Sequence, residues 1–165
     1  MAHSQTHFEL FELPVSFELD LQDLSQRYRD LQSAAHPDKF ATASDYERRL
    51  SVEMAAAIND AYQILKSPQK RARYMLELQS VSFDDEKDMA LDPAFLMEQI
   101  ELREALGELN KTDDPLASLN KIMADIKKRI TSVLDNIREQ LISGQLDEAQ
   151  KSNVKQLVHK MQFFK

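Results

Sequence analysis

The sequence predicts an all-α protein, and three observations support this prediction. Apolar residues recur at steps of three and four along most of the 165-residue chain, which places them on one side of a helix. Only 2 glycines and 5 prolines are present, and three of the prolines directly follow Ser67, Asp92 and Asp114. A polar capping residue before proline is typical of the first turn of a helix. The 42% of hydrophobic residues is enough to build helical cores.

Four helices are expected in the first part of the chain, and two of them form a hairpin. Asp20, with Asp23 three residues later, resembles the cap of the first long helix, and Ser67-Pro68 ends the second one. Each long helix has one apolar stripe, and we expect the two stripes to bury each other. The expected helices cover residues 8–13, 21–35, 45–65 and 69–78. The stripes consist of Leu21, Leu24, Tyr28, Leu31 and Ala35 on one arm and of Leu50, Met54, Ala57, Ile58, Ala61 and Leu65 on the other.

Three further helices are expected after a connector at residues 79–92. The connector carries an acidic run at residues 84–88 and lacks helical periodicity, so we predict a solvated link. The helices are expected at 93–109, 115–143 and 147–164, and Gly144 ends the middle one. Apolar residues of the middle helix form a seam of the kind that packs against antiparallel neighbours, which predicts a three-helix bundle. The predicted domain limits are therefore 1–78, 79–92 and 93–165. The seam consists of Leu116, Leu119, Met123, Ile126, Ile130, Val133 and Ile137.

His36-Pro37-Asp38 lies on the bend between the two hairpin arms. Pro37 cannot donate a backbone hydrogen bond and pushes His36 away from helical dihedral angles, so both polar side chains are presented on a stiff turn. We expect neither side chain to be in the core. Alone, a turn with proline and aspartate is most often an ordinary polar loop. The helices around it favour a functional interpretation.

The order of these segments resembles a J domain over roughly the first 78 residues. The resemblance rests on the short first helix, the Tyr28-bearing helix, His-Pro-Asp-Lys at 36–39, Ile-Asn-Asp-Ala-Tyr-Gln-Ile-Leu at 58–65 and Gln-Lys-Arg-Ala-Arg-Tyr at 69–74. The second half opens with Phe-Leu-Met-Glu-Gln-Ile-Glu-Leu-Arg-Glu at 95–104, which resembles the C-terminal domain of the HscB family of iron–sulfur co-chaperones. The combined resemblance spans nearly the whole chain and implies a J domain followed by a three-helix domain.

The J-domain resemblance implies docking on an HscA-like, DnaK-type ATPase chaperone and stimulation of its ATP hydrolysis. The implied chaperone-binding residues are Tyr28, Arg29, His36, Pro37 and Asp38. Asp38 can accept a bidentate pair of hydrogen bonds from an arginine of the ATPase. J domains also carry basic residues before this turn, but residues 32–35 are Gln-Ser-Ala-Ala, so we expect weaker or more selective electrostatic steering. Of the other matching residues, we expect Tyr74 to be a core or interdomain aromatic and Arg71 a helix-end charge.

The helix at 93–109 has more apolar surface than a bundle requires. One stripe is expected to face the core, and it consists of Phe95, Leu102, Leu106 and Leu109. Leu96, Met97 and Ile100 form a second stripe on another side. The second stripe needs either an intramolecular neighbour or a partner protein. The HscB resemblance implies a partner, the IscU-like scaffold on which iron–sulfur clusters are built. The implied scaffold-binding residues are Leu96, Met97, Ile100, Glu101, Glu104 and Leu157, although Leu157 replaces a frequent aromatic and core packing is its expected role.

Charge and composition exclude several classes of function. The net charge is −7 and neither half of the chain is basic, so we expect no nucleic-acid partner. No apolar run approaches the ~20 residues of a membrane-spanning helix, and we expect no membrane partner and a cytoplasmic location. Cysteine is absent, which excludes thiol nucleophiles and the usual ligands of iron–sulfur clusters. We therefore expect no metal, no cofactor and no enzymatic activity of the chain itself.

Three other interpretations stay open at this level. An enzyme could use His36, Asp38 and His159 as a metal or acid–base site, although His3, His7 and His159 lack ligand spacing and are expected at the surface. A general J-protein could bring many unfolded clients to its chaperone, although Cys-x-x-Cys pairs and a glycine–phenylalanine-rich linker are missing. A purely structural helical adaptor could carry the turn incidentally.

Overall fold

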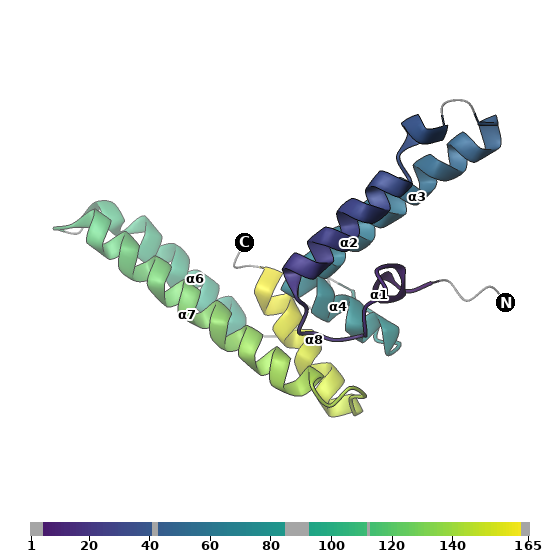
Figure 1. The fold of residues 1–165 in the computed structure, drawn as a ribbon. Coiled ribbons are helices and arrows are strands. Elements are labelled where there is room, and N and C mark those ends of the chain that lie inside the picture. Colours follow the sequence, from purple (N-terminus) through teal and green to yellow (C-terminus); the bar gives the residue numbers. More distant parts are fainter. Residues whose placement is uncertain (1–4, 41–42, 85–92, 112, 163–165) are drawn as a thin grey trace. The chain divides into compact units, whose positions relative to one another are not determined.

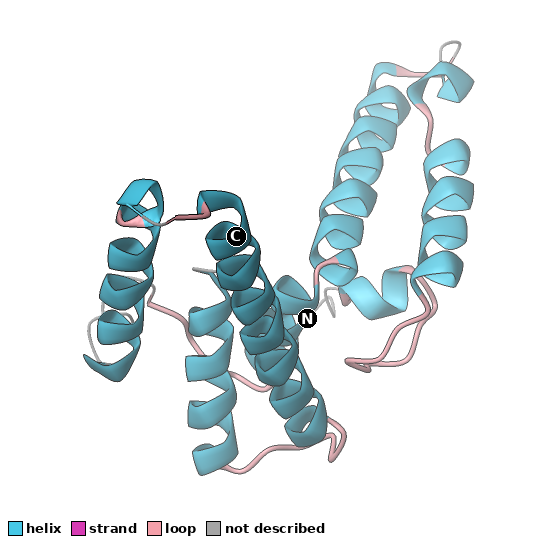
Figure 2. Cartoon of the chain, turned by 90° about the vertical axis from the view of Figure 1, so that its left-hand side faces the viewer, coloured by secondary structure: helices cyan, strands magenta, loops and turns pink. Residues whose placement is uncertain are grey.

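The computed structural model describes residues 5–40, 43–84, 93–111 and 113–162. Throughout these ranges the regular structure is helical, in agreement with the predicted fold class (Figure 2). The chain separates into two compact units, Met1–Met75 and Leu76–Lys165. None of the helices in the described ranges combines the length and the apolar character that a bilayer-spanning helix needs. In chain order, the elements are α1 (His7–Leu10), α2 (Leu21–Ala34), the 3₁₀ helix η1 (Pro37–Phe40), α3 (Asp45–Lys66), α4 (Pro68–Leu78), α6 (Pro93–Gly107), the 3₁₀ helix η2 (Leu109–Lys111), α7 (Pro115–Leu141) and α8 (Glu148–Gln162) (Figure 1).

Side-chain caps begin the first three α-helices. The carboxylate of Asp20 accepts the backbone N–H groups of the first turn of α2, which confirms the predicted cap. Two capping boxes, Thr6 with Glu9 and Ser44 with Glu47, begin α1 and α3. Hydrogen bonds from Ser44 to the carboxylate of Glu47 hold the pKa of that group below its ordinary value. The starts of α1, α2 and α3 are therefore determined locally.

The α2–α3 hairpin is the main structure of the first unit (Figure 1). Leu24, in the first turn of α2, and Ile58, in the C-terminal half of α3, are fully or almost fully buried. Leu50 and Met54, at the other end of α3, keep 47% and 45% of their surface exposed. The expectation that the stripes bury each other along their whole length is therefore wrong, because α3 has 22 residues and α2 only 14. The buried apolar residues of this unit are Phe8, Phe11, Phe17, Leu24, Ala35, Ile58, Ala61, Leu65, Ala72 and Met75.

Arg71 is a buried residue and not the helix-end charge that the sequence suggested. Its guanidinium donates a hydrogen bond to the carbonyl oxygen of Leu65 and lies 5.1 Å from the ring centroid of Phe17. Burial lowers the pKa of this guanidinium, and the charge of Glu18 opposes that change. The carbonyl groups in the last turn of α3 have no helical partner, so an internal donor satisfies one of them. Arg71 therefore joins the end of α3 to the loop before α2.

Tyr74 is a structural aromatic of the first unit. Its ring stacks on His7 at 4.2 Å between centroids, and its hydroxyl accepts the backbone N–H of His7 at 3.0 Å. The ring of Phe8 lies 6.0 Å away. These contacts join α4 to α1, and Tyr74 is half-buried at this junction.

In the second unit, α7 is a long central helix with a shorter neighbour along each half. Figure 1 shows α6 beside the N-terminal half of α7 and α8 beside its C-terminal half. The α7 seam is buried at Ile137, where α8 covers it, but Leu116 and Met123 are 68% and 59% exposed. The prediction that the whole seam is packed is therefore wrong, because α8 has 15 residues against 27 in α7. The buried apolar residues of α7, α8 and the turn between them are Ile137, Leu141, Leu146, Val154 and Val158.

Residues 79–84, predicted as part of a connector, fold within the second unit. The amide of Gln79 donates to the carbonyl of Gly144 at 2.9 Å and accepts the N–H of Leu146 at 3.0 Å. The Phe83 ring lies 5.4 Å from that of His159, which is buried. The expected surface position of His159 is therefore wrong, because an aromatic far away in sequence packs against it. Gly144 has φ of 80° after the end of α7, as expected for a helix-terminating glycine.

Candidate functional site

The bend that carries His36 and Asp38 is a short 3₁₀ helix. Nδ1 of His36 accepts the backbone N–H of Asp38 at 3.3 Å, and the His36 carbonyl accepts the N–H of Lys39 at 3.0 Å. The His36 and Asp38 side chains are 56% and 91% exposed, so neither is in the core, as predicted. Pro37 opens the 3₁₀ turn with its fixed φ. Local hydrogen bonds therefore hold the backbone while the Asp38 carboxylate projects into solvent.

Lys39, Phe40 and Ser44, which follow this bend, belong to a helix or cap one. Lys39 and Phe40 belong to η1, which packs against α3, and Ser44 already caps α3. Residues 41 and 42 lie outside the described ranges. The bend is thus supported on its C-terminal side by the start of the second arm.

Tyr28 and Arg29 differ in how free they are to meet a partner. The Tyr28 ring stacks on Tyr62 at 4.1 Å between centroids, and its hydroxyl lies 3.4 Å from Oδ1 of Asn59. Tyr28 therefore already contributes to hairpin packing. Arg29 is exposed and contacts only the side chain of Gln26, at 2.6 Å, among its described hydrogen bonds. Its guanidinium can exchange this exposed partner for one on another protein.

Arg27 is less available than its place beside Arg29 suggested. Its Nε contacts the carboxylate of Asp23 at 2.9 Å, and its Nη1 donates to the carbonyl of Phe11 at 3.0 Å. These bonds hold the residues after α1 against α2. Arg29 and Lys39 are consequently the better candidates for cationic contacts from this part of the first unit.

The second stripe of α6 is open to solvent. Leu96, Met97 and Ile100 are 47%, 59% and 50% exposed, and Glu101 and Glu104 are exposed beside them. Exposed apolar side chains that form a contiguous patch, rimmed by polar groups, are typical of a protein-binding surface. The second unit therefore leaves this stripe available, and its binding role stays a prediction.

The opposite side of α6 faces α7. Glu98 pairs with Arg129 of α7 at 3.6 Å, and Leu102 is half-buried between the two helices. Leu106 is 42% exposed, which corrects its assignment to the core stripe, and the side chain of Phe95 lies outside the described residues. Leu106 is exposed for the same reason as Met123, because α8 is too short to reach this part of α7. The groove between α6 and α7 is lined by Glu98, Gln99, Glu101, Leu102, Ala105, Ile122, Asp125, Ile126 and Arg129.

Leu157 lies in a groove that residues of α6, α7 and α8 line together. It is half-buried on α8 and shares a groove with Glu98 of α6 and Arg129 of α7. In the described structure, Leu96, Met97 and Ile100 do not line this groove. The arrangement agrees with a mainly structural role for Leu157.

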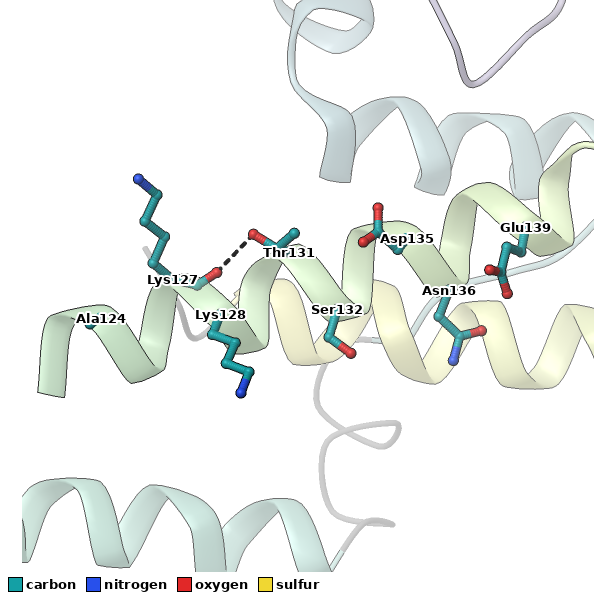
Figure 3. Close-up of a pocket in the computed structure, with 8 residues that line it drawn as sticks. All are labelled: Ala124, Lys127, Lys128, Thr131, Ser132, Asp135, Asn136 and Glu139. Atoms are coloured by element: carbon teal, nitrogen blue, oxygen red, sulfur yellow. Dashed lines mark hydrogen bonds between the residues drawn. The ribbon is translucent and has the colours of Figure 1, made fainter. Parts of the chain in front are cut away.

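Candidate metal ligands and one surface hollow were compared with the requirements of a metal-binding or ligand-binding site. Within the described ranges, no group of three or more His, Asp or Glu side chains is placed to hold a metal ion. The hollow shown in Figure 3 is lined by one helix only, α7, and mixes cations such as Lys128 with anions such as Asp135. Its dashed line is the hydrogen bond from the Thr131 hydroxyl to the Lys127 carbonyl, at 3.0 Å. This surface is the solvated polar face of a helix.

Comparison with known families identifies both halves of the chain. Residues 6–74 match the DnaJ domain family, and residues 91–165 match the family described as HSCB C-terminal oligomerisation domain. These two matches account for nearly all of the described residues. They also reproduce the order in which the sequence places its two resemblances.

Whole-length relatives agree with the family matches. The chain is 44% identical over 157 residues to the co-chaperone protein HscB homolog of Vibrio cholerae, covering 95% of this chain and 89% of the relative. It is 44% identical over 134 residues to the homolog of Shewanella amazonensis, covering 79% and 77%. The fold is similar to the structure of chaperone HscB from Vibrio cholerae, with a TM-score of 0.85 at 40% identity over 96% of this chain and 90% of that one. It is also similar to human co-chaperone protein HscB, with a TM-score of 0.86 at 27% identity over 99% and 79%.

Proposed function

The chain belongs to the HscB family of J-domain co-chaperones of iron–sulfur cluster assembly, and on that premise we propose that it couples two proteins. Its J domain stimulates ATP hydrolysis by a specialised HscA-like chaperone of the DnaK type. Its C-terminal domain delivers an IscU-like cluster scaffold to that chaperone. The observation that carries the proposal is the presence in one chain of an exposed His-Pro-Asp turn and an exposed apolar face on α6.

Asp38 is the central residue of the chaperone contact. Its carboxylate is 91% exposed while the backbone around it is held by hydrogen bonds, so little ordering entropy opposes contact with a partner. A carboxylate in this position can accept two parallel hydrogen bonds from one guanidinium. His36 contributes a hydrogen-bonding or packing contact. Pro37 fixes the relative direction in which the turn presents His36 and Asp38. Arg29 and Tyr28 extend the contact along α2.

Leu96, Met97 and Ile100 are the proposed anchors of the scaffold contact. Burial of their exposed surface supplies the apolar part of the binding free energy. Glu101 and Glu104 add a polar rim that favours a scaffold with basic residues at the matching edge. The thioether of Met97 can adapt to an irregular surface. Leu157 remains a proposed contact that its half-buried position makes secondary.

The two contacts act together through proximity. A scaffold bound to the C-terminal domain has a raised effective concentration at a chaperone that is bound to the J domain. ATP hydrolysis stimulated at the same time then traps the scaffold on the chaperone. A general J-protein for many clients is the alternative, and the match of residues 91–165 to the HscB C-terminal domain favours the dedicated function.

Variants that remove one contact at a time test the proposal. Asp38→Asn and His36→Gln are expected to abolish stimulation of an HscA-like ATPase while the affinity for scaffold stays within about twofold of wild type. Met97→Ala with Ile100→Ala is expected to weaken scaffold binding while stimulation by the J domain alone persists. Loss of both activities in a folded variant of either kind would contradict separate sites. A wild-type chain that stimulates the ATPase without binding scaffold would instead support a general J-protein.

A further inference from the structure

A polar and aromatic seam joins the two arms of the α2–α3 hairpin beside its apolar core. The side-chain amide of Gln32 on α2 donates to the backbone carbonyl of Ala55 on α3 at 2.9 Å. One turn earlier on α2, the ring of Tyr28 stacks on that of Tyr62 at 4.1 Å between centroids, with 18° between the ring planes. Both tyrosines are half-buried. The stacked pair is therefore fixed between the arms while part of it remains accessible to another protein.

Tyr62 is held at its hydroxyl and on both faces of its ring. The hydroxyl of Ser25 donates to the carbonyl of Leu21 at 2.7 Å, so the Tyr62 hydroxyl, 3.2 Å from Oγ of Ser25, is the donor of that pair. The ammonium of Lys66 lies 5.4 Å from the centroid of the Tyr62 ring. Because Tyr28 occupies one face of this ring, the ammonium lies over the other face. Tyr62 is thus a fixed base on which Tyr28 rests.

Tyr28 keeps groups that a partner can use. Its hydroxyl donates to Oδ1 of the exposed Asn59 at 3.4 Å, and one face of its ring stacks on Tyr62. A phenol hydroxyl that donates one hydrogen bond still has lone pairs that can accept another. The next residue, Arg29, is exposed. Tyr28 can therefore present ring surface and an acceptor oxygen beside Arg29 without leaving its stacked position.

We propose that Tyr62 is a positioning residue for Tyr28 in the chaperone contact, so that this contact depends on both arms of the hairpin. This role of Tyr62 rests on the proposed binding of an HscA-like chaperone. A Tyr28 ring that is already fixed loses little side-chain freedom when the chaperone covers it, whereas a ring without its base must be ordered at that moment. The chaperone group that meets the Tyr28 hydroxyl is a hydrogen-bond donor, because the oxygen is left as an acceptor.

The test is a titration of the steady-state ATPase of an HscA-like chaperone with the full-length chain and its variants. Each titration gives the maximal rate and the concentration of chain at half-maximal stimulation. Tyr62→Leu removes the flat ring, and Tyr62→Phe retains it. Tyr74→Leu is the matched control, because Tyr74 stacks on His7 at 4.2 Å and supports the junction of α1 and α4. Tyr28→Leu, alone and with Tyr62→Leu, completes a double-mutant cycle.

Circular dichroism and urea unfolding check that each variant is folded at the assay temperature. If Tyr62→Leu does not fold, Tyr62→Met replaces it in the cycle, since a thioether fills the space without a planar ring. The same outcome is expected of either variant.

We expect Tyr62→Leu to raise the half-maximal concentration by roughly three- to tenfold and to leave the maximal rate unchanged. Tyr62→Phe and Tyr74→Leu should each stay within about twofold of wild type. Because Tyr62 acts through Tyr28, adding Tyr62→Leu to Tyr28→Leu should change the half-maximal concentration by less than about twofold.

A folded Tyr62→Leu variant with the half-maximal concentration of wild type would overturn the proposal. An equal loss in Tyr74→Leu would do the same, because the effect would then follow from general destabilisation. Additive effects of Tyr62→Leu and Tyr28→Leu would also overturn it, because Tyr62 would then contact the chaperone by itself. A wild-type chain that does not stimulate the ATPase would instead contradict the proposed chaperone contact, which separates that failure from an error about Tyr62.

Discussion

Truncation of Met97 and Ile100 tests the scaffold contact in quantitative terms. The two side chains are 59% and 50% exposed in the free protein. Complete burial of a side chain of this size contributes about 1.5–3 kcal/mol, so burial of the exposed half on binding contributes about 1 kcal/mol or slightly more per residue. The double variant Met97→Ala, Ile100→Ala should therefore lose about 2 kcal/mol or more of binding free energy. That loss corresponds to roughly a thirtyfold or larger increase in the Kd for scaffold.

A matched control exists on the neighbouring helix. Met123 of α7 is also 59% exposed, and Leu116 is 68% exposed, so Met123→Ala with Leu116→Ala removes similar apolar surface outside the proposed contact. Isothermal titration calorimetry should give a control Kd within about twofold of wild type. The reasoning is refuted if the α6 variant binds within threefold of wild type, or if the α7 control loses as much affinity as the α6 variant.

Three further predictions concern the J domain. Asp38→Asn should remove ATPase stimulation but shift the melting temperature by no more than about 2 °C, because the side chain is 91% exposed. A much larger shift in scanning calorimetry would indicate a structural role for Asp38. Arg71→Ala should reduce the free energy of unfolding by about 2–4 kcal/mol, because it leaves a cavity and an unpaired carbonyl at Leu65. A urea midpoint equal to that of wild type would contradict the predicted loss of stability. The folded-state pKa of Glu47 is depressed from 4.5, so its stabilising effect is present above the unfolded pKa and is lost as the pH falls through the folded pKa. Thermal melts between about pH 6 and 3 should therefore show a smaller loss for Glu47→Gln than for wild type, and parallel curves would rule out this contribution.

The features that depended on local sequence were predictable. Proline at the centre of His36-Pro37-Asp38 was enough to indicate an exposed bend, and the 3.6-residue period separated the two stripes of α6. The capping boxes at Thr6 and Ser44 carried a readable signature, Ser or Thr followed three residues later by Glu, although neither of these two caps was predicted.

The features that depended on distant contacts were not predictable from spacing. Arg71 and His159 are buried because Phe17 and Phe83 pack against them, and these aromatics are separated from them by more than 50 residues in sequence. Met123 continues a regular apolar seam but is exposed, because its cover depends on the length of a different helix. Periodicity identifies which side of a helix is apolar, whereas burial also requires a neighbour that reaches it.

A steady-state ATPase assay of an HscA-like chaperone tests the central claim most directly. The chaperone is measured alone, with this chain, with an IscU-like scaffold, and with both. Coupling of the two contacts predicts that the rate with both exceeds the sum of the separate increases, and that Met97→Ala with Ile100→Ala removes the excess. Additive stimulation at saturating scaffold would contradict the account.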